Sequence, residues 1–406
     1  MQAQLAFDVG SVFTPGAPIN ERELFAGRLS QVRQIMEAIS QRGYHAVLFG
    51  ERGVGKTSLS NVLAGFLSDA GKAFLLSRVN CDASDTYTSL WRKALRDIVV
   101  TKSRPGIGFT ADDIEASHSI VEMLPEIVTP DDVRRVVTSL ARGVILVIVF
   151  DEFDRVHDKT ITSSMADTIK SLSDYSVPAT ILLIGVADSV DELIKEHQSI
   201  ERALVQIPMP RMSDEEVEEI IQKGLSRLKL TIDPTVMGHM VSLSQGIPYI
   251  THLLSLYTVR AALQDNMSHI TSEHVGVGIT RALEQWQQSI KVAYYEATKS
   301  PQPGHIYKEV LLACALAEVD DLRYFTAASV RKPLRIITDR QYEIPNFAKH
   351  LKELSNPVRG QILQRTGEKR RIRYRFASPI QRPYIIMRGF GDKIITKAML
   401  DKALKG

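Results

Sequence analysis

Short apolar runs of strand length alternate with amphipathic stretches through the first half of the 406-residue chain. The apolar runs occupy residues 45–50, 73–80, 144–150, 180–187 and 203–209. Between them, residues 29–40 place their apolar side chains on one side of a helix, and further helices are predicted over residues 56–71, 88–100 and 162–175. This alternation is typical of an α/β fold, a mostly parallel sheet with helices on both faces.

The remaining segments predict the domain organisation. Residues 1–22 contain Pro and Gly and are weakly patterned, which predicts an arm or loop. Residues 102–142 look like an insertion, with a Pro/Gly loop followed by polar helices around 112–124 and 130–143. From residue 213 to about 297 the pattern is helical without a strand, and residues 299–304 have the composition of a linker. We expect an N-terminal arm, an α/β core, an all-helical region and a C-terminal domain, over residues 1–22, 23–210, 211–298 and 299–406.

The sequence pattern of the C-terminal domain predicts three helices followed by a β-hairpin. Helices are expected over residues 305–317, 326–337 and 344–355. Thr326 is a candidate cap for the second helix, and Pro333 should interrupt or bend it. Residues 360–365 and 370–379 alternate like strands and are joined by a glycine-containing turn. Three helices with a two-stranded wing are typical of a winged-helix domain.

Charge is distributed unevenly along the chain. The whole chain has a net charge of +3, from 50 Lys and Arg against 47 Asp and Glu. Residues 301–406 hold 21 basic and 10 acidic residues, a net charge of +11, whereas the rest hold 29 and 37, a net charge of −8. The sequence therefore predicts a basic C-terminal domain attached to an acidic body.

Several classes of protein are disfavoured by the composition. No apolar run approaches the roughly 20 residues that span a bilayer, and the N-terminus lacks a signal-peptide pattern. The cysteines Cys81 and Cys314 lie far apart, so we expect no disulfide and a reducing cytoplasm. The 10 histidines show no metal-ligand spacing with Cys or carboxylates, which disfavours a zinc site.

The strongest chemical signal is the glycine-rich segment GERGVGKT, which follows one predicted strand and opens a helix. Its fixed positions match the phosphate-binding loop of P-loop NTPases, in which backbone N–H groups and the helix N-terminus face phosphate oxygens. Lys56 would reach the β- and γ-phosphates of ATP, and the Thr57 hydroxyl would bind Mg²⁺. The predicted phosphate-binding residues are Gly50, Glu51, Arg52, Gly53, Val54, Gly55, Lys56, Thr57 and Ser58.

A pair of acids follows the apolar strand at residues 144–150. A strand ending in adjacent acids places Asp151 at the carboxyl edge of the sheet, beside the phosphates, where it can hold Mg²⁺. Glu152 can orient or deprotonate the attacking water. Together with the glycine-rich loop, this pair predicts nucleotide hydrolysis.

Two further polar residues have open assignments. Asp188, after the fourth strand, is either a sensor of the γ-phosphate or the capping acid of the following helix. Arg202, just before the fifth strand, either reaches the nucleotide of a neighbouring subunit or is a solvated side chain that pairs with Glu201.

Together these residues resemble the AAA+ and STAND branches of the P-loop ATPases, and within them the bacterial and archaeal ATPases related to replication initiators of the origin-recognition type. The resemblance covers residues 23–297 and rests on the segments LFAGR, FGERGVGKTSL, VFDEFD, SIERAL…IPMPRMSDEE and GIP. It implies a sheet in the order 5-1-4-3-2, a helical lid, adenine contacts near Phe25 to Arg28, and an Arg202 finger acting across a subunit interface. Many AAA+ proteins carry a sensor arginine where this chain reads GIPYITHLL. This departure implies either that Pro248 and nearby His252 sense the nucleotide differently, or that turnover is slow.

The initiator-type ATPases also carry a winged helix after the lid. In the second strand of the predicted wing, Arg371, Arg373 and Arg375 alternate with packed residues and share one face. With Arg370 in the wing and Lys349 and Lys352 in the third helix, they would contact phosphates of duplex DNA. The alternatives are a solvated strand face or pairing with the acidic body.

Three functions fit these patterns. The first is an ATP-hydrolysing switch that oligomerises with nucleotide and binds DNA or a partner through its winged helix. The second is a STAND-type signalling or defence scaffold that uses ATP as a latch and binds an effector protein. The third is an ATPase regulator that recruits a nuclease or transposase to DNA.

Overall fold

The computed structural model describes residues 2–96, 98–104, 114–186, 200–302, 304–320, 322–368 and 371–404. The chain forms two compact units, which are described separately. The sheet unit is Pro18–Pro210, and the helical unit combines Met1–Ala17 with Arg211–Gly406. Within the described ranges, no helix has the length and apolar character needed to cross a membrane.

The sheet unit is built on a five-stranded parallel sheet in the order β2-β5-β6-β1-β7. When these strands are numbered one to five along the chain, this is the predicted order 5-1-4-3-2. The three central strands β1, β5 and β6 are almost wholly buried, as expected for a parallel sheet covered on both faces, whereas the edge strands β2 and β7 are partly exposed. Their bounds are β1 His45–Phe49, β2 Phe74–Asn80, β5 Ile145–Asp151, β6 Ala179–Gly185 and β7 Leu204–Pro208.

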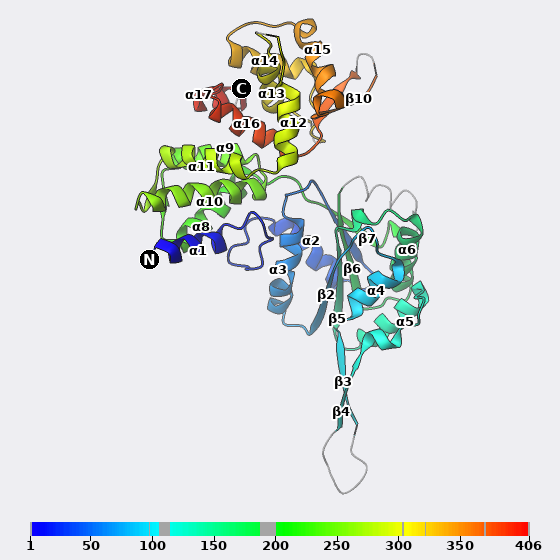
Figure 1. The fold of residues 1–406 in the computed structure, drawn as a ribbon. Coiled ribbons are helices and arrows are strands. Elements are labelled where there is room, and N and C mark those ends of the chain that lie inside the picture. The colour runs from blue at the N-terminus through cyan, green and yellow to red at the C-terminus, as the bar shows by residue number, and fades with distance from the viewer. Residues whose placement is uncertain are drawn as a thin grey trace. The chain divides into compact units, whose positions relative to one another are not determined.

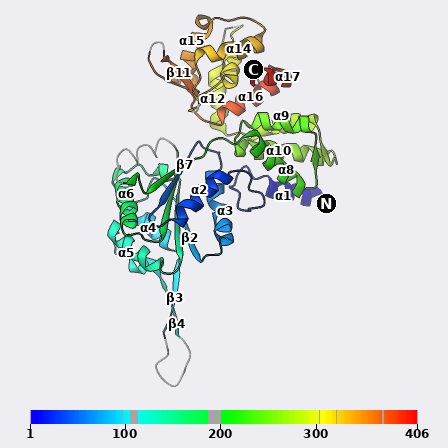
Figure 2. The ribbon, with the colours of Figure 1, turned by 180° about the vertical axis from the view of Figure 1, so that it is seen from behind.

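Helices cover both faces of this sheet (Figures 1 and 2). On one face, α2 and α3 pack through Ile35 and Leu63 onto strand residues such as Leu48. On the other face, α4, α5 and α6 form a second core, in which the Trp91 and Phe150 rings meet edge to face at 5.3 Å. These helices are α2 Leu29–Ser40, α3 Lys56–Asp69, α4 Tyr87–Arg96, α5 Pro130–Leu140 and α6 Lys159–Asp174.

The insertion differs from the prediction in its first half. The helix predicted to reach residue 100 ends at Arg96, and the helix predicted around 112–124 is absent from the described residues there. Instead, β3 Val99–Arg104 pairs antiparallel with β4 Ile114–Ser119, and a short 3-10 helix, η1 Ile120–Met123, follows. The hairpin projects from the sheet unit (Figure 1). The β-branched run at residues 98–101 favours an extended backbone over a helix.

The helical unit begins with a helix where we predicted a loop. Helix α1 is Gln2–Val12, so the prediction is wrong for this part of residues 1–22. Phe13 is buried, with its ring 6.0 Å from that of His252. A side chain at Gly224 would collide with the Phe13 ring, so this glycine leaves the space that the ring fills. Tertiary packing therefore fixes a segment whose own pattern is weak.

The predicted lid is helical, as expected, with one small exception. The two-residue strands β8 Thr231–Ile232 and β9 His269–Ile270 pair in parallel, although we predicted no strand in this region. The helices are α8 Asp214–Arg227, α9 Pro234–Ser244, α10 Pro248–Gln264, α11 Ser272–Gln285 and α12 Gln288–Thr298.

The C-terminal part contains the predicted three helices and hairpin. Thr326 caps α14 as expected, but Pro333 is accommodated inside that helix without ending it. Two more helices follow, α16 and α17, that we did not predict. The ring of Tyr384 in α16 lies 5.3 Å from that of Trp286, the residue that follows α11. The bounds are α13 Tyr307–Leu316, α14 Ala327–Thr338, α15 Ile344–Leu354, β10 Leu363–Thr366, β11 Arg373–Phe376, α16 Gln381–Gly391 and α17 Lys397–Leu404.

Candidate nucleotide-binding site

The glycine-rich loop lies between β1 and α3, at the carboxyl edge of the sheet. Gly53 and Gly55 have φ values of 83° and 97°, a region that L side chains rarely adopt. A side chain at Gly50 would collide with the carbonyl oxygen of Met209. Each of these glycines is therefore required by backbone geometry, as the sequence motif predicts.

The Lys56 side chain folds over this loop. Its Nζ donates to the carbonyl oxygens of Gly50 and Glu51, each at 2.8 Å. Burial lowers the pKa of the ammonium group, although Asp154 and Asp151 act in the opposite direction. Phosphate oxygens at the loop would offer stronger acceptors than these two carbonyls.

Asp151 and Thr57 come together at the end of β5. Asp151 is buried, its carboxylate is hydrogen-bonded by the Thr57 side chain, and Oδ1 accepts the Glu152 N–H at 2.8 Å. Burial raises the pKa of the Asp151 carboxyl. A hydroxyl and a carboxylate oxygen are ligands that suit Mg²⁺, which usually takes its other ligands from water and substrate phosphates. In the described residues no cluster of three or more His, Cys, Asp or Glu could hold a metal by itself. Thr57 and Asp151 therefore supply two oxygen atoms of the kind that fit a Mg²⁺ ion.

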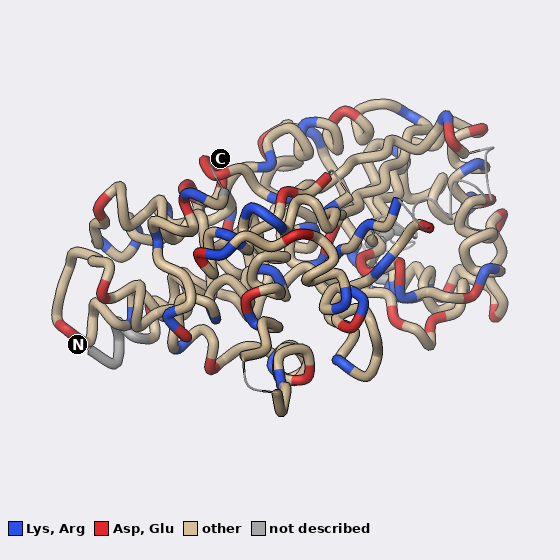
Figure 3. The backbone as a smooth tube through the Cα atoms, turned by 90° about the horizontal axis from the view of Figure 1, so that it is seen from above, with Lys and Arg blue, Asp and Glu red and all other residues tan. Residues whose placement is uncertain are grey.

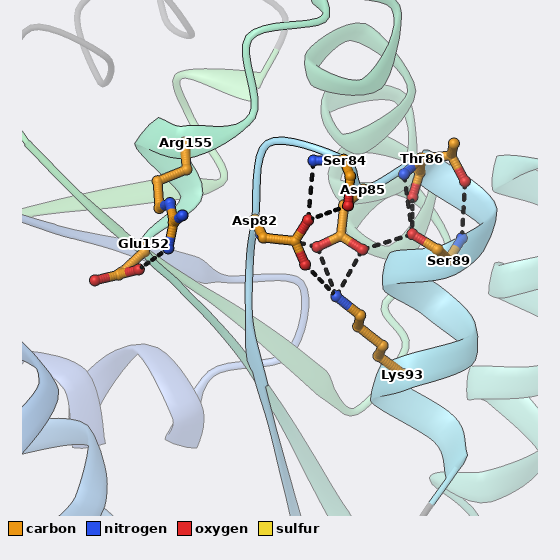
Figure 4. A network of polar contacts seen from close by, with 8 residues as sticks. All are labelled: Asp82, Ser84, Asp85, Thr86, Ser89, Lys93, Glu152 and Arg155. Carbon is orange, nitrogen blue, oxygen red and sulfur yellow. Dashed lines mark hydrogen bonds and ion pairs between the residues drawn. The ribbon is translucent and has the colours of Figure 1, made fainter.

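Glu152 has a left-handed backbone, with φ 55°, which turns its side chain away from the strand direction. Its Oε2 lies 2.9 Å from Nη1 of Arg155, one turn later, and both side chains are about half exposed (Figure 4). To act on a water molecule, the carboxylate would have to exchange this partner.

A second acidic pair at this edge was missed by sequence reasoning. Lys93 of α4 lies 2.9 Å from Asp82 and 2.7 Å from Asp85, which follow β2 (Figure 4). Hydrogen bonds from Ser84, and then from Lys93, lower the pKa of Asp82. Adjacent to this pair, Cys81 donates its N–H to the Asp151 carbonyl at 2.8 Å. The segment NCDASD carries a signal similar to that of VFDEFD, because in both a pair of acids closely follows an apolar strand.

The remaining predicted loop residues and their neighbours occupy different environments. Arg52 is exposed, whereas Val54 is fully buried. The Ser58 hydroxyl accepts the Ile19 N–H at 3.1 Å. Phe25 is buried, with its ring 6.5 Å from that of Phe66. The Ser58 hydroxyl and the Phe25 ring therefore already contact other residues of the protein.

Arg28, predicted with Phe25 to contact the adenine, is buried. Its Nη2 donates to the carbonyl oxygens of Val54 at 3.2 Å and Pro210 at 2.6 Å. The guanidinium therefore has two main-chain acceptors inside the protein.

Three predicted residues lie away from this group. Arg202 is exposed and lies two residues before β7, at the amino edge of the sheet. Pro248 is the first residue of α10 in the helical unit. Nearby, Gly246 has φ 69°, and its carbonyl accepts the Met212 N–H at 2.8 Å, which gives this Gly-x-Pro segment a structural role. Asp188 lies outside the described residues.

The predicted basic face of the hairpin is partly engaged within the protein. Arg373 pairs with Asp320 at 2.9 Å, and Arg375 donates to Gln364 at 2.7 Å. Both guanidinium groups also lie about 5 Å from the Tyr324 ring centroid. Arg371 is exposed, and Arg370 lies outside the described residues.

The predicted lysines of α15 are available at the surface. The Lys349 side chain is 83% exposed and lies 3.8 Å from Glu353. Lys352 is exposed as well. Along the described part of the backbone, basic and acidic residues are interspersed (Figure 3).

Comparison with known proteins gives one family and a set of distant structures. The model of the family described as Novel STAND NTPase 1 matches residues 18–315. Comparison with curated proteins gives no match. Among solved structures, the chain is similar to the ORC2 protein of Aeropyrum pernix in its ADPNP–ADP complexes, with 14% identity, coverage of 96% of this chain and 99% of that chain, and a TM-score of 0.48. It is also similar to CDC6P from Pyrobaculum aerophilum, with 15% identity, 98% coverage of each chain and a TM-score of 0.46.

The Aeropyrum pernix ORC1 protein in complex with DNA is a further similar structure, with 14% identity, coverage of 95% of this chain and 98% of that chain, and a TM-score of 0.44. No ligand or partner is carried over from similarities of this size. The family match is of a different kind, because it covers most of the chain and includes the glycine-rich loop and the Asp151–Glu152 pair. It confirms the predicted resemblance to STAND-type P-loop NTPases. The chain belongs to the Novel STAND NTPase 1 family.

Proposed function

We propose that the protein binds and hydrolyses ATP and uses the nucleotide as a conformational switch. The observation that carries this proposal is the convergence of Lys56, Thr57 and Asp151 around a glycine-built loop at the carboxyl edge of the sheet. That edge is where ligands bind in open α/β sheets.

The residues divide the chemistry among them. Loop N–H groups and the N-terminus of α3 receive the phosphates, and Lys56 exchanges the Gly50 and Glu51 carbonyls for β- and γ-phosphate oxygens. Thr57 and Asp151 hold Mg²⁺, which supplies neutralising charge when bound. Glu152 leaves Arg155 and orients or deprotonates the attacking water.

The position of Arg202 supports a role for this side chain at an interface between subunits. It precedes β7, whose far end lies by the glycine-rich loop, and five strand residues span about 16 Å. Its side chain cannot reach the nucleotide of its own chain over that distance. We propose that it completes the site of a neighbouring copy, so that ATP promotes oligomers.

The C-terminal part supports a winged helix that binds duplex DNA. In this arrangement α15 presents Lys349 and Lys352. Arg371 is exposed just before β11 rather than within the strand as predicted, and Arg373 at the start of β11 pairs with Asp320 at the surface. These positive groups suit phosphates rather than base edges.

A second candidate is a scaffold whose C-terminal domain binds protein. The pairing of Arg373 with Asp320 favours it, because the arginine face already accepts a carboxylate next to the Tyr324 ring. An acidic partner segment could replace Asp320 in the same geometry. Recruitment of a nuclease or transposase would use the same surfaces.

One set of measurements tests these proposals. ATP binding and phosphate release are measured with and without Mg²⁺, and the protein is sized with ATP analogue, ADP or no nucleotide, each with and without duplex DNA. We expect Mg²⁺-dependent hydrolysis and a larger species with ATP analogue. Absence of nucleotide binding by the wild-type protein would overturn the proposal. Absence of duplex binding at low salt in every nucleotide state would favour the scaffold.

A further inference from the structure

Arg28 stands out among the charged residues of the sheet unit because it is 2% exposed and its guanidinium donates to two main-chain carbonyls. A buried charge is tolerated only when acceptors surround it. The two acceptors belong to Val54, inside the glycine-rich loop, and Pro210, the last residue of the sheet unit. Segments more than 150 residues apart in the sequence are thus joined through one side chain.

The backbone around Arg28 is built for this contact. Gly27 and Arg28 are consecutive left-handed residues, with φ values of 61° and 62°, immediately before α2. A left-handed conformation is unfavourable for a residue with a side chain and persists where the surrounding structure requires it. Arg28 nevertheless continues into the helix, since its carbonyl accepts the Val32 N–H at 3.0 Å.

Each carbonyl fixes a whole peptide plane. In a planar trans peptide the C=O and the next N–H point in opposite directions. Holding the Val54 oxygen therefore also orients the Gly55 N–H, a predicted phosphate donor at the start of α3. Holding the Pro210 oxygen orients the peptide plane at which the chain passes into the helical unit.

We infer that Arg28 is a positioning residue that couples the glycine-rich loop to the crossing at Pro210, so that phosphate binding at the loop changes how the helical unit is held. This inference rests on the proposed nucleotide binding. It replaces the expectation that Arg28 contacts adenine.

The experiment compares Arg28→Ala and Arg28→Lys with Gln31→Ala in the full-length chain. Gln31 is a matched control because it is also buried and donates to the carbonyl of Pro208, at 3.4 Å, rather than to that of Val54 in the loop. Affinities for ATP and GTP are measured with fluorescent analogues. Movement between the units is measured by energy transfer between dyes on Lys72→Cys and Lys402→Cys, both exposed positions, since the native Cys81 and Cys314 are buried.

We expect Arg28→Ala to lose about 10-fold or more in affinity for ATP and GTP alike. At saturating ATP it should also lose the nucleotide-dependent change in energy transfer. Arg28→Lys keeps the charge and the donors on a shorter side chain, so it should recover part of each, and Gln31→Ala should behave as wild type. If Arg28→Ala does not fold, judged by its melting curve, Arg28→Lys carries the comparison.

Three outcomes would overturn the inference. Wild-type affinity in both Arg28 variants would remove any role at the loop. Loss of ATP binding with unchanged GTP binding would indicate direct adenine contact. An unchanged energy-transfer response in variants that are saturated with ATP would show that the loop and the crossing are independent. Failure of the proposed function itself is distinct, because the wild-type protein would then bind no nucleotide.

Discussion

The glycine-rich loop and the C-terminal hairpin both carry positive side chains, yet the protein holds them in different ways. At the loop, Lys56 is bonded to two main-chain carbonyls and its glycines are required by φ and by close contacts. At the hairpin, Arg373 and Arg375 are bonded to side chains, Asp320 and Gln364, which are themselves at the surface. Main-chain acceptors are fixed in place, whereas surface side chains can exchange partners at little cost. A ligand of the loop must therefore fit a preformed backbone, while a ligand of the hairpin must displace existing pairs.

The largest effect is expected for hydrolysis. Glu152→Gln should retain ATP binding but slow phosphate release by about 10²- to 10⁴-fold, because the amide cannot accept a proton. Arg155→Gln is the matched control, since it removes the Glu152 partner and leaves the carboxylate. Normal turnover by Glu152→Gln in a phosphate-release assay would make the assignment of this residue wrong.

Nucleotide binding should depend on Lys56. Lys56→Ala should weaken ATP affinity by about 100-fold, because charge-assisted hydrogen bonds to the phosphates are lost. Lys72→Ala, an exposed lysine of the same unit beyond α3, should leave affinity unchanged. If a binding titration gave the same ATP affinity for both variants, Lys56 would not be part of a preformed phosphate-binding site.

The hairpin should respond to substitution in an uneven manner. Arg371→Ala should reduce duplex affinity several-fold and lower the salt slope by about 0.9, as for one lost phosphate contact. Arg373→Ala should change less, because its charge is already balanced by Asp320. If Asp320→Ala fails to strengthen duplex binding at low salt, the pairing does not limit access to the hairpin.

The loop side of this comparison should also respond to pH. Burial raises the pKa of Asp151, so its neutral form persists to higher pH than that of an ordinary aspartate. Mg²⁺-dependent ATP binding should therefore weaken as the pH falls through this raised value, which a series of ATP titrations at different pH values would measure.

The same burial has a consequence for stability. A carboxyl with a raised folded-state pKa favours folding below its unfolded-state pKa, and this contribution is lost as the pH rises through the folded-state value. Asp151→Asn should therefore raise the melting temperature of the nucleotide-free protein at neutral pH by a few degrees. It should also abolish the Mg²⁺ response. An unchanged or lower melting temperature would show that the ionised Asp151 carboxylate does not destabilise the folded protein at neutral pH.

The predictable parts of the structure are those with local signals. The apolar runs predicted the parallel sheet, and the resemblance predicted its strand order. The glycine motif and the acids after the third strand predicted that Lys56, Thr57 and Asp151 lie together. Helix α1 was missed because Phe13 becomes ordered through Gly224 and His252, which are distant in sequence. Helix α16 was missed for a similar reason, since its Gly389 is packed tightly against Leu312 and Ile395.

The polar contacts of the site were less predictable than its outline. Nothing in the segment LFAGR indicates that the Arg28 side chain would be shared by Val54 and Pro210. The pairing of Glu152 with Arg155 also depends on the left-handed backbone at Glu152, which is unusual for a glutamate. Such details are set by tertiary structure rather than by residue type.

The docking of α1 on the helical unit has a consequence for limited proteolysis. The chain passes between the units at residues 17–18 and again at 210–211. A single cut at the second crossing would leave residues 1–17 attached covalently to the sheet unit, with Phe13 still seated between Gly224 and His252. The two fragments would then stay associated through that ring and separate only on denaturation, so a nicked protein would run as one species on a sizing column.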